Sequence, residues 1–352
     1  MSIHRIARYA GRPLLMTEPA ARELALRALS FDAGAMRHER LARQPAKFLK
    51  RLGVGAYAQP DMADGPMQPA AYAPSFASAP EHEGFGWTLC DGIACLEIDG
   101  ALMDRGFSSI SGSVFWGYDA IGAALHEAHA DARVKGIFIR MDSPGGVVSG
   151  TLEALTEDMR SLRETGNEDG KPIFVYADMA ASAGYWIASQ ADRIFAPAVG
   201  MVGSIGAVIV HEDHSEALEK HGVKITPIQF GAKKTDGAWF APLSESARED
   251  LQAEIDAVGE RFLADVSAGR EFLSRAKLLA TEAGCMMASH PDPARSGIKL
   301  GLVDEIAREE DAYHSLIAHV RHSALAIHTP SVSASRAAPP PRKRLTQKAA
   351  RK

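Results

Sequence analysis

Ser182 lies within AASAG, residues 180–184, where small residues follow an apolar segment and precede helix-forming residues. A serine between a strand and a helix has free backbone N–H groups and the positive end of the helix dipole beside it. A serine that attacks a carbonyl needs such donors for the oxyanion, so Ser182 is a candidate nucleophile. The alternative is a serine that only caps the helix. The α/β-hydrolase elbow, G-x-S-x-G, is only half matched, because Ala180 replaces its first glycine.

The segment MDSPGG, residues 141–146, directly follows a second apolar run. Gly145 and Gly146 permit backbone conformations that other residues avoid, so their N–H groups can point into a cleft. Beside a nucleophile, they become candidates for an oxyanion donor and for a substrate-binding edge. A plain turn is the alternative.

A serine hydroxyl also needs a base, and the sequence offers two kinds. His211 lies near the end of a predicted strand and would suit a Ser-His-Asp arrangement. In FGAKKTDG, residues 230–237, one of Lys233 and Lys234 would point inward on an extended segment. A buried lysine is a competent base because desolvation disfavours its ammonium form. Two solvated surface lysines are the alternative.

Strand-like and helix-like segments alternate around these motifs. The sequence predicts strands over 92–100, 134–141, 172–177, 193–198, 205–210 and 224–230, and helices over 119–130, 149–164, 182–191, 212–221 and 244–268. This alternation is typical of an α/β fold with a largely parallel sheet and crossover helices.

The composition divides the 352 residues into four parts. We expect a helical segment over 1–55, where Thr17 resembles a helix start, and a Pro/Ala/Gly-rich linker over 56–84. Residues 85–320 form the predicted folded domain, and 321–352 form a disordered basic tail. Hydrophobic residues make up 46% and charged residues 24%, as in soluble globular proteins.

Charge and cysteine content exclude several classes of protein. The net charge is −5, yet Asp311 is the last acidic residue and eight Lys or Arg follow it. An acidic body argues against a nucleic-acid-binding core and leaves only the basic tail for weak contact with nucleic acid. Cys90, Cys95 and Cys285 are too few for a disulfide framework, and CDGIAC lacks zinc-site spacing. The longest uncharged run, 194–210, is interrupted by Pro and Gly, so we expect no membrane-spanning helix.

In their order along the chain, four segments resemble the signal peptide peptidase A family of serine peptidases, including its phage branch, the head maturation proteases. They lie within residues 92–306 and read VKGIFIRMDSPGG, AASAGYWIASQADRIFAPAVGMVGSIGAV, FGAKKTDG and GIKLGLVDEI. The resemblance implies a crotonase-like fold shared with Clp protease. It also implies a Ser-Lys dyad that cleaves peptide bonds with no metal and no organic cofactor.

The resemblance assigns roles to three side chains. Ser182 matches the nucleophile, and Lys234, in the Gly-x-x-Lys segment that begins at Gly231, matches the general base. Ser204 in GSIG matches the serine that hydrogen-bonds the lysine amine and orients it.

The same resemblance assigns the oxyanion hole to backbone groups. Gly145 or Gly146 would supply one N–H group and Ala183 the other. Small residues beside the serine suggest a groove that favours small or apolar substrate side chains.

The resemblance also implies a setting: protein and peptide substrates, a homo-oligomer, and the cytoplasm of a bacterial host. For the phage branch, the substrates are capsid and scaffold proteins inside an assembling head. Three alternatives remain open: a peptidase that degrades signal peptides, a Clp-type peptidase that uses Ser182 and His211, and an inactive scaffold protein with a crotonase-like fold.

Overall fold

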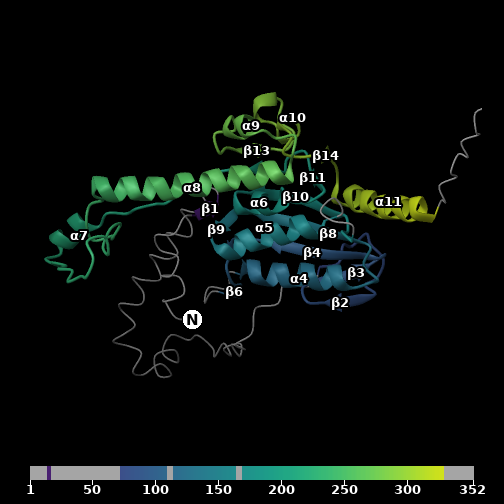
Figure 1. The fold of residues 1–352 in the computed structure, drawn as a ribbon, viewed down its shortest axis with the longest axis horizontal. Helices are drawn as coiled ribbons and strands as arrows, with labels where there is room; N and C mark the ends of the chain where they lie inside the picture. The colour runs from purple at the N-terminus through teal and green to yellow at the C-terminus, as the bar shows by residue number, and fades with distance from the viewer. Residues whose placement is uncertain (1–13, 17–71, 109–113, 164–168, 329–352) are drawn as a thin grey trace, which may run out of the picture.

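The structure is a computed structural model that describes residues 14–16, 72–108, 114–163 and 169–328 (Figure 1). Its centre is a sheet with the strand order β13-β12-β10-β8-β4-β3-β2, to which β11 and β14 add beside β10. The strands are β2 (His82–Gly84), β3 (Trp87–Cys90), β4 (Ile93–Asp99), β8 (Gly136–Ser143), β10 (Ile173–Ala181), β11 (Arg193–Ala196), β12 (Met201–Gly203), β13 (Cys285–Met287) and β14 (Glu305–Ile306).

The middle of this sheet is parallel. The pairs β4–β8, β8–β10, β10–β11, β10–β12 and β11–β14 run parallel, while β2–β3, β3–β4 and β12–β13 run antiparallel at the two sides. Buried apolar residues on both faces of β8 and β10 are typical of parallel strands covered by helices on both sides. The predicted α/β fold with a largely parallel sheet is therefore confirmed.

Two hydrophobic cores cover the two faces of the sheet. On one face pack α4 (Tyr118–Ala130), α5 (Gly150–Leu162), α6 (Ala183–Ala188) and the end of the long α8 (Glu245–Gly269). On the other face, α11 (Glu309–His328) packs Tyr313 and Leu316 onto the aromatic residues of the strands. Serine caps begin α5 and α8, because Ser149 accepts from the N–H of Leu152 and Ser244 from that of Ala247.

A second, smaller sheet stands at the end of β8. Its order is β1-β9-β5-β7-β6, built from β1 (Leu14–Met16), β5 (Leu102–Met103), β6 (Phe107–Ser108), β7 (Val114–Gly117) and β9 (Gly145–Val147). The chain passes from β8 directly into β9, so this sheet continues from the carboxyl end of the central one. The shorter elements α9 (Arg275–Leu279), η1 (Pro293–Arg295) and α10 (Gly297–Leu300) lie between α8 and β14.

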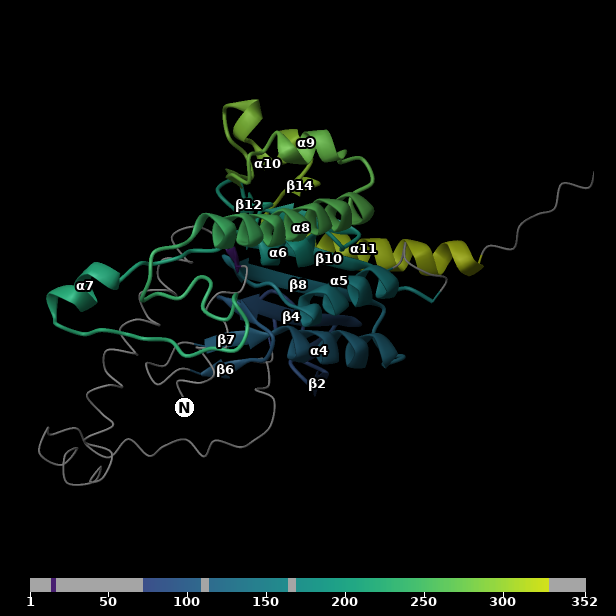
Figure 2. The same ribbon diagram turned by 60° about the vertical axis from the view of Figure 1, so that its left-hand side comes forward.

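The segment between β12 and α8 leaves the body of the molecule. We call residues 208–243 the arm; it contains one short helix, α7 (Ser215–Lys220), and no buried residue. In both ribbon views α7 lies well away from the central sheet (Figure 1, Figure 2). Seven of the ten large hydrophobic side chains that are exposed in the described part of the chain belong to the arm.

Several predicted elements differ from the structure. The strands predicted over 205–210 and 224–230 are wrong, because the described part of the chain forms no strand in either segment and only an isolated β-bridge at Val208. The predicted turn in DSPGG contains the start of β9. Helix α11 continues to His328, beyond the predicted start of the tail at 321. In the segment expected to be helical, 1–55, Leu14–Met16 is a strand, and the rest, with the Thr17 helix start, lies outside the described residues.

Candidate active site

Ser182 occupies a strained position between β10 and α6. Its backbone has φ 56° and ψ −119°, a conformation that costs energy for any residue other than glycine, and it is fully buried. It stands at the N-cap position, yet its side chain makes no capping hydrogen bond. The hydroxyl instead points toward the carbonyl oxygen of Gly206, with Oγ at 3.4 Å. The capping alternative therefore does not explain this serine.

Well-packed neighbours hold the strained serine in place. The N–H of Ser182 donates to the carbonyl of Gly203 at 2.8 Å, and the N–H of Trp186 donates to the carbonyl of Ser182 at 2.9 Å. One turn into α6, the indole of Trp186 stacks on Phe262 with 4.4 Å between the rings, and its Nε1–H donates to Asp265. A buried network of this kind can supply the energy that the backbone strain costs.

The glycine loop after β8 lies directly beside Ser182. Ser143, at the end of β8, is in register with Ala180, two residues before the nucleophile. The hydroxyl of Ser143 donates to the carbonyl of Gly100 at 2.8 Å and accepts from the N–H of Gly145 at 3.2 Å. A Cβ on Gly184 would lie only 3.2 Å from Ser143, so the start of α6 rests against this loop.

Both loop glycines are required by the backbone. Gly145 has φ 115°, a conformation that favours glycine. A Cβ on Gly146 would come within 2.2 Å of the carbonyl oxygen of Leu102 and 2.6 Å of the hydroxyl of Tyr118. The predicted oxyanion residues Gly145, Gly146 and Ala183 are thus buried around one point, with Ala183 as the first residue of α6.

The structure also brings Ser204 to this point. Ala181 on β10 pairs with Gly203 on β12 in parallel register. Ser182 and Ser204 directly follow these two residues, so they lie at the ends of neighbouring strands. Ser204 is 9% exposed with φ 53°, and its N–H donates to the carbonyl of Gly284. Within the described residues its hydroxyl has no hydrogen-bond partner, so it remains free to bind an amine.

Lys234 lies on the arm, and the structure does not bring it to Ser182. Its side chain is exposed, and among the described residues its Nζ has neither a hydrogen bond nor an ion pair. Its neighbour Lys233 forms an ion pair with Asp250 on α8. The alternative base, His211, also lies on the arm; its Nε2 is buried without a partner, and it makes no hydrogen bond to Ser182 in the described part of the chain. In the described part of a single copy, neither candidate base therefore contacts Ser182.

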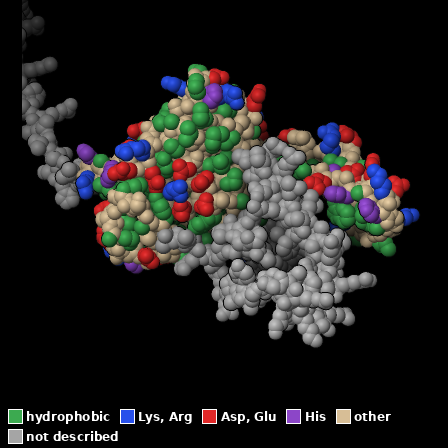
Figure 3. Space-filling model, turned by 180° about the vertical axis from the view of Figure 1, so that it is seen from behind, with side chains coloured by type: hydrophobic (Ala, Val, Ile, Leu, Met, Phe, Trp, Pro, Cys, Tyr) green, Lys and Arg blue, Asp and Glu red, His purple; other side chains and the backbone are tan. Residues whose placement is uncertain are grey.

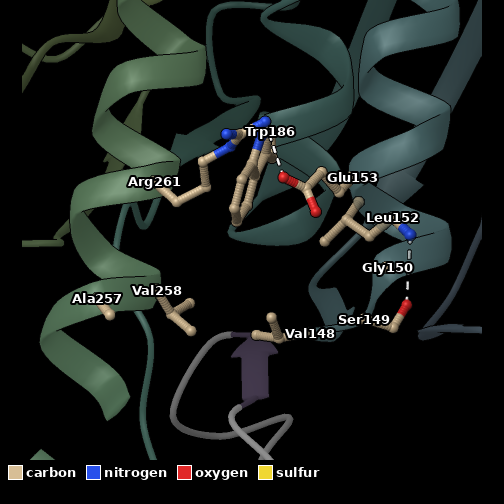
Figure 4. A pocket seen from close by; sticks show the side chains of 9 residues that line it. All are labelled: Val148, Ser149, Gly150, Leu152, Glu153, Trp186, Ala257, Val258 and Arg261. Carbon is tan, nitrogen blue, oxygen red and sulfur yellow. Dashed lines mark hydrogen bonds and ion pairs between the residues drawn. The ribbon is translucent and has the colours of Figure 1, made fainter. Parts of the chain in front are cut away.

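A cavity of about 350 Å³ opens next to the nucleophile helix (Figure 4). It lies between the start of α5, Trp186 on α6, and Ala257, Val258 and Arg261 on α8. Its walls are mostly apolar, and an ion pair of 2.7 Å between Arg261 and Glu153 stands at its side. The sequence did not predict this cavity, since its three walls come from distant segments. The sequence feature that could have indicated the cavity is Trp186, a large aromatic residue one turn after Ser182.

Charged side chains gather on the opposite face of the sheet, where red and blue atoms meet near the middle of Figure 3. On the face of the sheet that α11 covers, Arg140 contacts Glu97 at 2.5 Å and Asp178 at 2.8 Å. The pKa values of Asp99 and Asp142 are raised, first by burial and then by a neighbouring carboxylate. No group of side chains in the described residues has the arrangement of a metal site.

Comparison with known proteins identifies related sequences. Residues 165–322 match the family model of Peptidase family S49. Capsid assembly protease C of Escherichia phage lambda is 33% identical over 318 residues, which cover 88% of this chain and 64% of that protein. Head-tail preconnector protein GP5 of Enterobacteria phage P21 is 35% identical over 229 residues, which cover 64% and 43%. The chain thus spans less than two thirds of the length of either relative.

Protease 4 of Haemophilus influenzae is 32% identical over 221 residues, which cover 62% of this chain and 33% of that protein. Among solved structures, a membrane-bound stomatin-specific protease in complex with a substrate peptide has a TM-score of 0.38 at 14% identity and covers 63% of this chain and 77% of that one. An enoyl-CoA hydratase/isomerase family member has a TM-score of 0.33 at 17% identity, covering 67% and 75%. Because these TM-scores are low, the assignment of the fold class rests on the parallel sheet described above and not on these two structures.

Proposed function

We propose that this chain, whose residues 165–322 match the model of Peptidase family S49, is a serine endopeptidase with Ser182 as nucleophile and Lys234 as general base. The observation that carries this proposal is the backbone of Ser182. A fully buried serine with φ 56° and no capping bond is held under strain, and such strain is typical of functional positions.

The surrounding backbone supports the oxyanion role. Ala183 begins α6, so its N–H has no acceptor within the helix and is available to a developing oxyanion. The loop of Gly145 and Gly146 faces the same junction and would supply the second donor. The N–H of Gly145 already donates to Oγ of Ser143, so it must give up this hydrogen bond before it can donate to an oxyanion.

We propose that Lys234 reaches Ser182 from a second copy of the chain. The arm that carries it buries no residue, while Ile228 and Phe230 on the same arm are 100% exposed. Exposed apolar side chains gathered on one projecting segment are typical of a surface that binds another protein. Docking the arm onto a neighbouring body would cover these side chains and remove Lys234 from water, which favours the neutral amine.

The proposed reaction has two balanced stages. The neutral amine of Lys234 takes the proton of Ser182 as Oγ attacks the peptide carbonyl, and the oxyanion is held by backbone N–H groups. Lys234 then gives this proton to the leaving amine, and the acyl-enzyme remains. Water, deprotonated by Lys234, releases the acyl group and restores the hydroxyl of Ser182. The hydroxyl of Ser204 would hold the amine in place.

The names of the relatives suggest the substrates. Because capsid assembly protease C and a head-tail preconnector protein are similar to this chain, we propose capsid and scaffold proteins of an assembling phage head as its targets. None of the described helices combines the length and the hydropathy that crossing a bilayer requires. The apolar cavity beside Trp186 would suit an apolar substrate side chain.

Mixing two inactive variants tests the proposed site. Ser182→Ala and Lys234→Ala should each lower cleavage of fluorescein-labelled casein by about 10⁴-fold. If copies exchange arms, a mixture of the two variants regains activity, because random assembly pairs an intact serine with an intact lysine at about a quarter of the sites. Lys233→Ala, next to the proposed base, is the matched control and should retain activity within about 2-fold.

Two results would contradict this mechanism. Full activity of Lys234→Ala together with inactivity of His211→Ala would show that His211, and not Lys234, is the general base. No recovery in the mixture, at a concentration where the copies are shown to associate, would exclude a site shared between copies. For the substrates, mass spectrometry of capsid and scaffold proteins of the same phage, co-expressed with the wild type or with Ser182→Ala, reveals the cleavage sites.

A further inference from the structure

A segment near the start of the chain pairs with the glycine loop of the candidate site. Strand β1 runs antiparallel to β9, with Leu14 opposite Val147, Leu15 opposite Gly146 and Met16 opposite Gly145. The close view of the cavity draws β1 in purple beside Val148 (Figure 4). The β1 residues are separated from their β9 partners by about 130 positions of sequence, so this contact is tertiary.

Strand β1 takes the one edge of β9 that the rest of the domain leaves open. On its other side β9 pairs with β5, where Leu102 is in register with Gly146. An extended peptide that binds a strand edge gains its affinity from main-chain hydrogen bonds, which any sequence without proline can form. The edge that a protein substrate would use next to Ser182 is therefore occupied by the chain itself.

The end of β1 lies toward the candidate site. Its last residue, Met16, lies opposite Gly145, two residues after Ser143. Ser143 in turn is in register with Ala180, two residues before Ser182. A peptide that followed β1 along β9 would thus present the residue opposite Gly145 at the end of the strand where the serine and the oxyanion donors lie.

We infer that β1 is a cis-acting competitor, which occupies the substrate strand position on Gly145–Val147 and must leave it before a protein can be cleaved. This inference rests on the proposed peptidase function. A strand of three residues makes few hydrogen bonds, so its affinity as a separate peptide is low. Because it is tethered to the domain, however, it competes at an effective concentration on the order of 1 mM.

Proline substitutions remove β1 from the edge without changing the site. In an antiparallel pair, alternate residues direct their N–H groups toward the partner strand, and proline has no N–H group. If the N–H of Leu15 points toward β9, Leu15→Pro removes that hydrogen bond. If instead the N–H groups of Leu14 and Met16 point toward β9, the double variant Leu14→Pro/Met16→Pro removes theirs. At least one of the two should cleave labelled casein about 10-fold faster than the wild type, through a lower KM. Ala7→Pro, outside β1, is the matched control and should behave as the wild type.

A binding experiment tests the same inference without catalysis. In the Ser182→Ala background, a dye-labelled peptide of residues 10–20, AGRPLLMTEPA, is titrated with the protein and followed by fluorescence anisotropy. The β1-disrupted protein should bind the peptide about 10-fold more tightly than the protein with β1 intact. Equal binding by the two proteins would overturn the inference, and so would no binding by either up to about 1 mM protein, the effective concentration of the tethered strand.

A serine-directed fluorophosphonate separates this failure from a failure of the proposed function. If it labels the wild type and not Ser182→Ala, the peptidase site exists whatever β1 does. Labelling together with unchanged peptide binding would refute only the role of β1. Absence of labelling in every variant, including those without β1, would refute the peptidase function itself. The Ala7→Pro control and the thermal unfolding of each variant exclude a general loss of folding as the cause.

Discussion

The proposed nucleophile and the proposed base lie in two regions of opposite character. Ser182 is fully buried, held by backbone hydrogen bonds and backed by a stacked tryptophan. Lys234 stands on an arm with no buried residue between 208 and 243. The difference teaches that one copy of the fold holds the proposed nucleophile and the proposed oxyanion donors in its core, while its own proposed proton acceptor lies outside them. In the proposed mechanism, assembly of copies therefore acts as the switch for proteolysis.

The two regions also differ in how they are stabilised. In the body, charged groups are paired in defined geometry, as in the bidentate contact of Arg270 with Asp304 at 2.6 and 2.8 Å. In the arm, the internal contacts are few and exposed, for example the hydrogen bond of 2.8 Å between Thr235 and Gln229. Substitutions in the body should therefore change folding stability, whereas substitutions in the arm should change association and activity.

Among the substitutions that compare the two regions, the largest effect is expected on association, from the apolar side chains of the arm. Ile228→Ser/Phe230→Ser removes two fully exposed apolar groups and should weaken association by about 1,000-fold, at about 2 kcal/mol for each anchor. Analytical ultracentrifugation measures the association, and casein cleavage should fall with it. The melting temperature of the body should stay unchanged.

The matched control for the arm is Val199→Ser. Val199 is 75% exposed but lies on the body, so its substitution should alter neither association nor cleavage. If the arm variant associated as the wild type does, the arm would not be the interface, and the shared catalytic site would be refuted.

A medium effect is expected from breaking the buried ion pair at the end of α8. The side chain of Arg270 is 3% exposed, and Asp304, its partner, also accepts from the N–H of Ile194. Arg270→Met leaves this carboxylate without its cation, which should lower the free energy of unfolding by about 3 kcal/mol in urea denaturation. Arg248→Ala, which breaks an exposed pair with Glu245, should cost about 0.5 kcal/mol or less. Both pairs involve α8, so equal costs for the two variants would contradict the expected difference between a buried and an exposed ion pair.

The smallest effect is a difference in folding stability between two variants of Ser182. Ser182→Gly and Ser182→Ala both remove the hydroxyl, but only glycine relieves the backbone at φ 56°. The glycine variant should unfold at a free energy about 1 kcal/mol higher than the alanine variant, while both are inactive. Differential scanning calorimetry measures the difference. A glycine variant less stable than the alanine variant would show that the backbone of Ser182 carries no strain.

Local patterns were sufficient to predict the parallel strands β4, β8, β10 and β11 and the helices on one face of the sheet, but not α11 on the other face or the remaining strands. The helix predicted over 244–268 is α8, and the helix predicted over 119–130 is α4, because apolar spacing and capping residues act over a few neighbouring positions. The prediction of a strand over 224–230 was wrong for the same reason, because a local pattern contains no information about a distant partner strand. Its pattern suits a strand, but a strand needs a partner, and on the arm Ile228 and Phe230 have none.

The amino-acid sequence by itself determined the chemistry of the site: a serine at a strand–helix junction, two glycines after a buried strand, and a family resemblance that joined them to Lys234. Tertiary structure alone decided which of these groups meet. Parallel register places Ser182, Ser204 and the glycine loop together, since the carboxyl ends of neighbouring parallel strands share one edge. Tertiary structure also pairs β1 with that loop and leaves Lys234 outside the site. Local sequence could not predict either feature, because it carries no signal for packing between distant segments.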